Sequence, residues 1–206
     1  MGYAPMKSSL VSDVDRLLAS QALAWPALAR GLAGLRESKT RSERVFGRDV
    51  LLRHIPHRIK STTAAVDAVS ISQRKCFLCP GNLDPEEEGI PFEDGFTLYC
   101  NPFPILQRHL TIVHSDHTPQ RISGQFAPFL KLARALPDSF VIYNGPACGA
   151  SAPDHLHFQS CRLLRSTAVT SRHDALVGQL AHFARLAGAH MAFEPGGKRE
   201  FCIWRR

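Results

Sequence analysis

The stretch 143-YNGPACGASAPDHLHFQS-160 joins a run of small residues to a segment in which polar and apolar side chains alternate. Successive side chains of an extended strand point to opposite faces of a sheet. His155, His157 and Gln159 are therefore predicted to share one face, while Leu156 and Phe158 point into the core. Neighbouring members of the polar trio would stand about 6.6 Å apart. The alternation predicts a strand that carries a row of polar groups.

The small residues before this strand are suited to holding an anion. Asn144, Gly149 and Ser151 lie in a loop without bulky side chains near its end. Backbone N–H groups and a serine hydroxyl can approach a phosphate closely in such a loop. A histidine beside it is a suitable nucleophile on phosphorus, since imidazole is neutral and basic near pH 7. The alternatives are a strand whose histidines face solvent and an Asn144 that only forms a turn.

The composition indicates one ordinary globular domain. The chain has 206 residues, of which 44% are hydrophobic and 21% charged, which is not the composition of a disordered tail. Its formal net charge of +7 suits phosphorylated, anionic partners. The basic residues are spread without a long run, so a solvated surface explains them better, and we expect no nucleic acid partner.

The apolar segment 17–35 predicts helices packed on the core. Gln21 and Arg30 interrupt it, and Pro26 breaks its middle, so we interpret it neither as a signal peptide nor as a membrane span. We therefore expect a cytoplasmic protein without a membrane partner.

Cys76 and Cys79 form a Cys-x-x-Cys pair. In a cytosolic protein such a pair points to metal or redox chemistry. The alternative is that both are ordinary buried thiols.

Periodicity along the chain predicts an α+β fold, in which an antiparallel sheet has helices packed on one side. We expect helices at 9–36, 123–136 and 172–187, a strand or hairpin at 45–56, and strands at 96–104, 108–115, 139–144, 189–193 and 200–205. Helix 123–136 is expected to begin with Ser123 as its cap and to bury Phe126, Phe129, Leu130 and Ala133. We divide the chain into an N-terminal helical segment, 1–40, and a main domain, 41–206.

The run His155-Leu156-His157-Phe158-Gln159 resembles the signature of the histidine-triad superfamily, in its Gln-ended nucleotidyltransferase branch. That branch includes galactose-1-phosphate uridylyltransferase, diadenosine tetraphosphate phosphorylase and GDP-L-galactose phosphorylase. The segment 108-RHLTIVHSDHTP-119 resembles a second strand and turn of the same fold, and "CFLC", "NPFPILQRHLTI" and "HTPQ" add to the likeness, which is greatest to bacterial members of the branch. The resemblance covers roughly residues 56–165.

The resemblance implies a histidine-triad-like antiparallel sheet and a two-step, ping-pong reaction. His157 would attack the α-phosphorus of a nucleoside diphosphate sugar or dinucleoside polyphosphate and form a covalent nucleotidyl-histidine. Phosphate or a sugar phosphate would then accept the nucleotide. Gln159 would hold a phosphoryl oxygen, and because an amide cannot do acid–base work, it favours an acceptor that is already an anion. Further substrate contacts are implied for Asn144, Gly149, Ser151 and His109, with a local hydrogen bond as the alternative for His109.

The resemblance also implies a zinc site made by Cys76, Cys79, His117 and His155. Four protein ligands leave no open position on the metal, so this zinc would be structural and would brace the strand beside His157. The sequence spacing does not bring the histidines to the cysteine pair, and a pair of thiols left from a lost site stays the alternative.

Two features differ from the resembled branch: this sequence holds a single motif, and it stops soon after it. We therefore expect a main domain that is truncated at its C-terminus. Two further hypotheses remain open, a nucleotide hydrolase, which Gln159 disfavours, and a catalytically inactive nucleotide-binding protein. A homodimer is also left open, since many relatives pair through their sheets.

Overall fold

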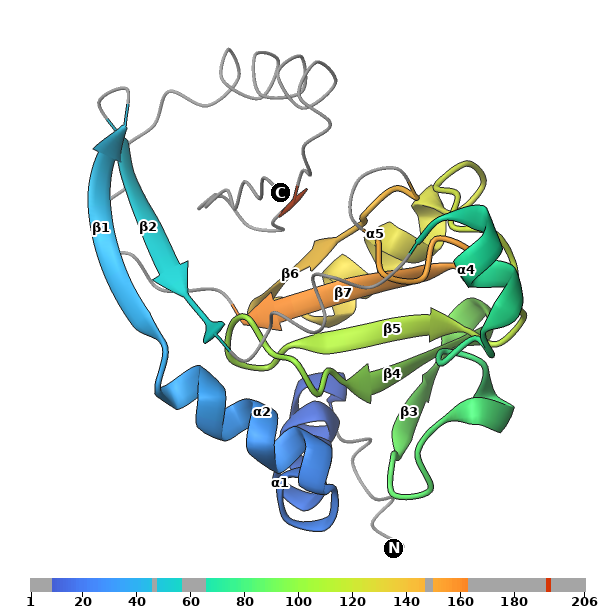
Figure 1. Ribbon diagram of the computed structural model, residues 1–206, viewed down its shortest axis with the longest axis horizontal. Helices are drawn as coiled ribbons and strands as arrows, with labels where there is room; N and C mark the ends of the chain where they lie inside the picture. The colour runs from blue at the N-terminus through green and yellow to red at the C-terminus, as the bar shows by residue number, and fades with distance from the viewer. Residues whose placement is uncertain (1–8, 46–47, 57–65, 147–149, 163–191, 194–206) are drawn as a thin grey trace, which may run out of the picture.

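The computed structural model describes residues 9–45, 48–56, 66–146, 150–162 and 192–193. Its centre is a six-stranded sheet in the order β3-β4-β5-β7-β6-β8, with every neighbouring pair antiparallel (Figure 1). The strands are β3 (Gly89–Phe92), β4 (Phe96–Cys100), β5 (Leu110–His114), β6 (Ser139–Ile142), β7 (His157–Arg162) and β8 (Ala192–Phe193). The predicted α+β fold with an antiparallel sheet is confirmed.

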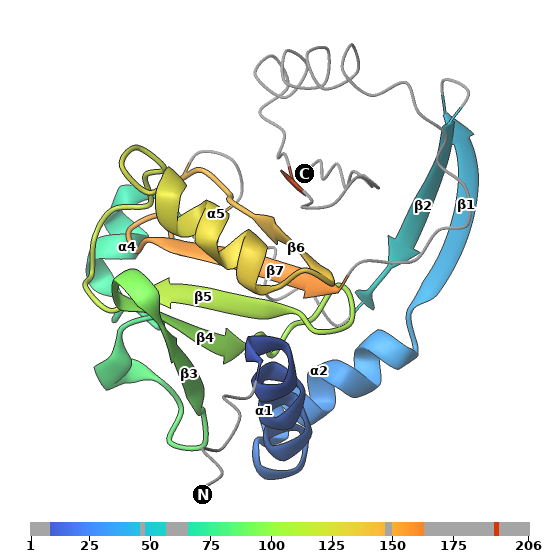
Figure 2. The same cartoon turned by 180° about the vertical axis from the view of Figure 1, so that it is seen from behind.

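Two helices cover one face of this sheet. Figure 2 shows α1 (Leu10–Ala24) and α5 (Phe126–Ala135) in front of the strands, whereas in Figure 1 α5 lies behind them. Phe158 is 0% exposed beneath α5, and its ring lies 5.2 Å from that of Phe96 and 5.3 Å from that of Phe129. Leu156 belongs to the same core. The predicted inward direction of Leu156 and Phe158 is confirmed, and burying such a side chain is worth about 1.5–3 kcal/mol.

Helix α5 buries only part of the face that its sequence predicts: Phe129 and Ala133 are buried as expected, but Phe126 and Leu130 are not. Phe129, Leu132 and Ala133 are buried, while Phe126 and Leu130 are 56% and 49% exposed. Apolar residues occupy two overlapping stripes of this helix, and both stripes have helical spacing, so periodicity alone could not choose between them. The cap was also wrong, because the helix begins after Gln125, whose side chain makes no capping hydrogen bond.

The N-terminal segment forms two helices, as the apolar pattern predicts. Helix α2 (Pro26–Arg36) follows α1 directly, and Trp25 is both the C-cap of α1 and the N-cap of α2. Pro26 is suited to the first helical position, where no backbone donor is needed. Gly31 lies against the 102–104 loop, because a Cβ at this position would stand 2.0 Å from the Pro102 oxygen. Only glycine permits so close an approach of the helix to the backbone.

A charged side chain fastens α1 to the sheet just before β5. The Arg108 guanidinium pairs with Asp138 and, at 2.9 Å, with Asp15, and it donates a hydrogen bond of 2.9 Å to the Val11 carbonyl. Arg108 has a positive φ of 52°, a conformation that non-glycine residues adopt at some energetic cost. The contacts of Arg108 therefore hold the direction in which the backbone continues into His109 and β5.

The hairpin at the other end of the molecule is longer than the sequence predicts. Strands β1 (Lys39–Val45) and β2 (Arg48–His54) pair antiparallel and form a separate two-stranded sheet that extends away from the six-stranded sheet (Figure 1). The expected start at residue 45 was wrong, since residues 39–44 carry no alternation of apolar and polar side chains from which a strand can be read.

Short elements lie on the sheet face opposite α5. They are α4 (Ala68–Gln73), which appears in front of the strands in Figure 1, and the single 3₁₀ turn η2 (Pro80–Asn82). A second 3₁₀ turn, η3 (Glu93–Gly95), lies beside α5, where Lys131 pairs with Glu93 and Asp94. The carboxylate of Asp67 caps α4 by accepting from the Ser70 N–H at 2.9 Å. Across the described ranges, the structure contains no helix with the length and apolar character needed to span a bilayer.

The C-terminal predictions fall mostly outside the described residues. Ala192–Phe193 form β8 and pair with β6, within the strand expected at 189–193. The helix expected at 172–187 and the strand at 200–205 lie outside the described residues. The division of the chain at residue 40 and the truncated C-terminus stay predictions.

Candidate functional site

The polar residues of the alternating segment lie on the sheet face that α5 does not cover. His157 stands opposite Val113 of β5, and Gln159 stands opposite Thr111. His155 precedes β7 by two positions and lies outside the ladder. His155 and His157 are 0% and 3% exposed, so the alternative in which these histidines face solvent is wrong. Loops from other parts of the chain cover this face, so burial here is a property of the tertiary fold.

The ring of His157 has a defined tautomer. Its Nδ1 lies 2.8 Å from the carbonyl oxygen of His155. A carbonyl oxygen can only accept, so Nδ1 carries the proton, and the lone pair of the neutral ring is on Nε2. Burial lowers the pKa of His157, because the charged ring would lose its hydration. Nε2 is therefore the basic nitrogen of this imidazole.

Gln120 fixes the backbone of His157, a role that no sequence pattern predicted, since the residue stood out only as part of the "HTPQ" run. Its side chain is 0% exposed. The amide oxygen accepts from the His157 N–H at 2.8 Å, and the amide nitrogen donates to the carbonyl oxygens of His157 at 2.9 Å and of Asn144 at 2.8 Å. Strand β6 ends at Ile142, opposite Gln159, so Gln120 supplies the hydrogen bonds that a longer β6 would make.

Gln159 is held by His109. The Nε2 of His109 lies 2.8 Å from Oε1 of Gln159, and its Nδ1 accepts from the Ile105 N–H at 3.2 Å. His109 is 2% exposed and immediately precedes β5, the strand that pairs with β7. The two residues that the sequence assigned to different roles are therefore direct neighbours.

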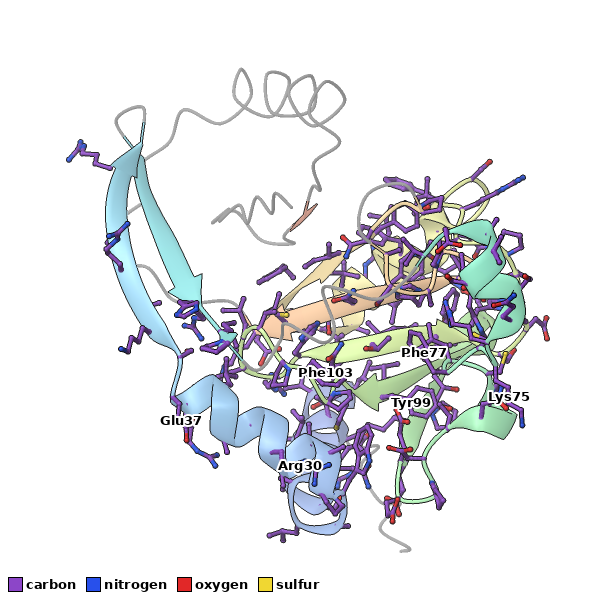
Figure 3. All side chains as sticks on the ribbon, viewed as in Figure 1. Arg30, Glu37, Lys75, Phe77, Tyr99 and Phe103 are labelled. Carbon is purple, nitrogen blue, oxygen red and sulfur yellow. The ribbon has the colours of Figure 1, made fainter. Side chains whose placement is uncertain are left out.

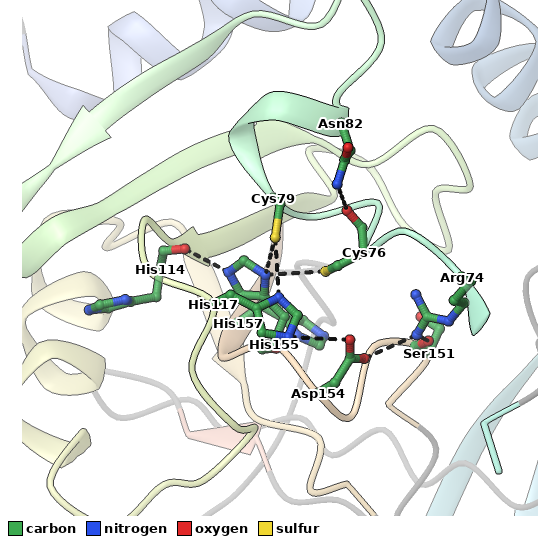
Figure 4. Close-up of polar contacts among 10 residues, drawn as sticks. All are labelled: Arg74, Cys76, Cys79, Asn82, His114, His117, Ser151, Asp154, His155 and His157. Atoms are coloured by element: carbon green, nitrogen blue, oxygen red, sulfur yellow. Dashed lines mark hydrogen bonds and ion pairs between the residues drawn. The ribbon is translucent and has the colours of Figure 1, made fainter. Parts of the chain in front are cut away.

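Cys76, Cys79, His117 and His155 form a single cluster, whose ligand atoms all lie within 4.8 Å of one another (Figure 4). Nδ1 of His155 is 3.3 Å from the sulfur of Cys76 and 3.6 Å from that of Cys79, and Nδ1 of His117 is 3.1 Å from Cys79. A tetrahedral zinc with ordinary bond lengths places sulfur and nitrogen ligands about 3.5 Å apart. The donor types and spacings fit a metal of this kind, and this cluster could hold one.

Hydrogen bonds and ion pairs with neighbouring residues orient the side chains of this cluster. The Nε2 of His155 donates to the His114 carbonyl at 2.7 Å, which leaves the Nδ1 lone pair for a metal. Asp154 lies 3.6 Å from Nε2 of His117 and pairs with Arg74 at 3.0 Å. Burial raises the pKa of the Cys79 thiol, and the neighbouring Cys76 adds to the rise. A bound divalent cation reverses that effect, since it stabilises the thiolate.

The small-residue loop begins and ends beside these groups. The carbonyl of Asn144 is bound by Gln120, and the carbonyl of Ser151 accepts from Arg74 at 3.3 Å (Figure 4). Ser151 is partly exposed and Ala152 is fully buried. Gly149 lies outside the described residues, so its predicted contact stays a prediction.

Aromatic side chains from β4 and from two loops lie on the same side of the sheet. Figure 3 shows Phe77, Tyr99 and Phe103 over this side of the sheet. Tyr99 stands opposite Thr111, which in turn stands opposite Gln159. Phe77 and Phe103 are 46% and 38% exposed. The face therefore changes from imidazole and amide groups on β7 to aromatic groups beside β4.

The family model described as "Domain of unknown function (DUF4922)" matches residues 17–162, which include the cysteine pair, Gln120 and all of β7. The chain belongs to the DUF4922 family. No curated protein matches the sequence. The DUF4922 match ends at Arg162, the last residue of β7, and spans all the site residues whose contacts are described above.

The fold of this DUF4922 protein is similar to that of yeast Ap4A phosphorylase Apa2. With the structure of Apa2 in complex with Ap4A, the TM-score is 0.50 at 15% identity, over 76% of this chain and 53% of Apa2. With the complex of Apa2 with AMP, the TM-score is 0.46 at 16% identity, over 76% of this chain and 51% of that one. The DUF4922 chain thus spans about half the length of Apa2, and at this identity the likeness shows the fold alone.

Proposed function

We propose that this protein is a nucleotidyltransferase of the phosphorylase type. It moves a nucleoside monophosphate from a nucleoside diphosphate sugar or a dinucleoside polyphosphate to phosphate or a sugar phosphate. The observation that carries the proposal is the ring of His157, whose Nδ1–H is bound by the His155 carbonyl at 2.8 Å so that Nε2 holds the lone pair. The fold shared with an Ap4A phosphorylase supports a substrate of this class.

In the first step, Nε2 of His157 attacks the α-phosphorus of the donor. The Nε2–P bond forms, the P–O bond to the leaving group breaks, and the leaving group departs as a phosphate anion that takes both bonding electrons. The ring becomes a substituted imidazolium, whose positive charge is stabilised by donation from Nδ1–H to the His155 carbonyl. No proton has to move.

In the second step, an anionic oxygen of the acceptor attacks the same phosphorus. The new P–O bond forms, the Nε2–P bond breaks, and His157 returns to its neutral state. Again no proton is transferred, which agrees with an amide at position 159, since a carboxamide can donate a hydrogen bond but cannot exchange a proton. The proposed acceptor is therefore phosphate or a sugar phosphate, and water is disfavoured.

The groups around His157 would bind the phosphates and stabilise the charge that develops on them. Gln159 would donate to a phosphoryl oxygen, and Ser151 and the backbone N–H of Gly149 would add donors from the loop. Asn144 would contact the same phosphates. Donors fixed in advance by the fold are worth more than donors that reorganise during the reaction.

Cys76, Cys79, His117 and His155 would hold a structural zinc ion. Their number fills a tetrahedral coordination sphere, so the metal would contribute stability and take no part in the transfer. Because His155 is two residues from His157 and its carbonyl binds the His157 ring, a metal held there would also fix the nucleophile.

Incubation with a donor labelled in its α-phosphate tests the proposal. Labelled diadenosine tetraphosphate and a labelled GDP-sugar would each be mixed with the protein, with and without inorganic phosphate. We expect label to be trapped on the protein in the absence of phosphate and released as a nucleoside diphosphate when phosphate is added. His157→Asn should abolish the trapped label, because the amide offers no nucleophilic nitrogen.

The matched control is His114→Asn. His114 lies on β5 and its Nδ1 accepts from the Asp116 N–H at 3.1 Å, a bond that the asparagine oxygen can replace. This variant should trap label like the natural protein. Release of label by water alone would favour the hydrolase hypothesis, and binding without any turnover would favour an inactive nucleotide-binding protein. Full activity of His157→Asn would end the proposed mechanism.

A further inference from the structure

We infer that His109 is a positioning residue that sets the direction of the Gln159 carboxamide, so that the amide donors of Gln159 face the substrate. This inference rests on the proposed function for its catalytic meaning, while the positioning itself follows from contacts between described residues. The sequence had suggested either a substrate contact or a local hydrogen bond for His109. A side chain that is 2% exposed, with both ring nitrogens bound to protein groups, is better suited to acting through its neighbour.

The direction of the hydrogen bonds follows from a backbone group. The Ile105 N–H can only donate, and it lies 3.2 Å from Nδ1 of His109. Nδ1 must therefore be the accepting nitrogen, and the ring must be neutral with its proton on Nε2. That Nε2–H then donates to Oε1 of Gln159 at 2.8 Å. The chain of contacts from Ile105 thus decides which end of the carboxamide meets the histidine.

A carboxamide has two nearly identical ends, and its direction is set only by what it binds. With Oε1 engaged by His109, both N–H groups of Gln159 remain on the other end of the amide. If the amide turned by 180°, two donors would meet across the contact and the oxygen would face an anionic substrate, which is repulsive on both sides. His109 thereby selects a donor at the position where a phosphoryl oxygen is proposed to lie.

A double-mutant cycle tests whether His109 acts through Gln159. Turnover of diadenosine tetraphosphate with phosphate would be measured for Gln159→Ala, for His109→Phe and for both changes together. Removing a preorganised donor lowers kcat by about 10²–10³-fold, so Gln159→Ala should fall by that amount. His109→Phe should lower kcat by about tenfold or more with a smaller change in KM. The double variant should match Gln159→Ala within about twofold.

The inference is overturned if the two losses multiply in the double variant, because His109 would then act independently of Gln159. It is also overturned if Gln159→Ala keeps full activity. Since His109→Phe leaves the buried Ile105 N–H without an acceptor and can lose stability, a second variant, His109→Gln, retains a donor at the end of the side chain. It should recover at least about tenfold over His109→Phe. Equal loss in both variants, with unchanged melting temperatures, argues against positioning.

A readout without turnover separates this inference from the proposed function. Two-bond proton–nitrogen correlation spectra of the labelled protein report the imidazole tautomer, and His109 should carry its proton on Nε2. AMP binding, measured by calorimetric titration, should weaken in Gln159→Ala and weaken no further when His109→Phe is added. If no donor is turned over but both results hold, the transferase proposal fails and the positioning stands. A proton on Nδ1 of His109 overturns the positioning whatever the activity.

Discussion

The side chain of Gln120 binds both backbone polar groups of His157, accepting from its N–H at 2.8 Å and donating to its carbonyl at 2.9 Å. His157 is paired with Val113 of β5 on one side, and on the other side β6 ends too early to reach it. The buried carboxamide of Gln120 thus makes the two hydrogen bonds to His157 that a neighbouring strand would otherwise make. The candidate nucleophile is held in extended conformation although it lies at the end of the ladder.

Replacing Gln120 by leucine should lower the free energy of unfolding by about 2–4 kcal/mol. The change leaves the buried N–H and C=O of His157 without partners, and each unsatisfied group costs about 1–3 kcal/mol. Urea denaturation followed by circular dichroism measures the loss. Gln73→Leu, at an exposed position at the end of α4, is the control and should change stability by less than about 0.5 kcal/mol. Similar values for the two variants would contradict the structural role of Gln120.

The purified protein should contain close to one zinc ion per chain, and Cys76→Ser should lose it. A serine hydroxyl is a much poorer zinc ligand than a thiolate, and structural zinc contributes directly to folding. Elemental analysis and melting temperature measure both effects, and a chelator should destabilise the natural protein but not the variant. Cys100→Ser is the control, since Cys100 is buried in a separate apolar cluster with Trp25 and Leu28. Retention of zinc by Cys76→Ser would rule out the assigned ligand set.

Stability should depend on pH through Glu87, which lies in the loop before β3. Burial raises the pKa of this carboxyl to about 7, and nearby Asp84 adds to the rise. Because the folded pKa lies above the unfolded value of 4.5, the favourable contribution is complete below that value and is lost as the pH rises through about 7. Glu87→Gln stays neutral and should melt higher than the natural protein at pH 8.

The comparison that decides this prediction is the gap in melting temperature between Glu87→Gln and the natural protein. It should be larger at pH 8 than at pH 5, where the glutamic acid is itself neutral in the folded state. Glu86→Gln, at an exposed neighbouring position, controls for the removal of one negative charge. A gap of the same size at both pH values would show that Glu87 does not titrate as described.

Phe158→Ala should be among the most destabilising single changes in this protein. The ring is 0% exposed and contacts the rings of Phe96 and Phe129, and truncating a buried phenylalanine costs about 3–5 kcal/mol. Phe126→Ala on the exposed side of α5 is the matched control, with an expected loss below about 1 kcal/mol. Chemical denaturation of both variants gives the comparison, and a larger loss at Phe126 would mean that the helix faces were assigned incorrectly.

The alternation of residues 155–159 was sufficient to predict the inward direction of Leu156 and Phe158, because strand geometry is local. The resemblance to the histidine-triad branch supplied a metal ligand set that the structure brings together, although Cys76 and His155 are 79 positions apart. No pattern in the sequence could have shown that meeting, since it depends on how a distant loop packs on the sheet.

What the sequence could not show is the role of single buried polar residues. Gln120 and His109 each bind a proposed catalytic residue, yet neither stands in a periodic pattern that would predict it. The burial of His155 and His157 was missed for the same reason, because the loops that cover them come from other parts of the chain. Local periodicity predicts which way a side chain points and carries no information about what lies over it.

Because β6 ends at Ile142, this fold can accept some sequence changes more easily than others. Because Gln120, and not a longer β6, holds His157 in line, the position of His157 does not depend on how far β6 extends past Ile142. A substitution at the end of β6 should therefore leave the register of β7 unchanged, whereas a substitution at position 120 should disturb it.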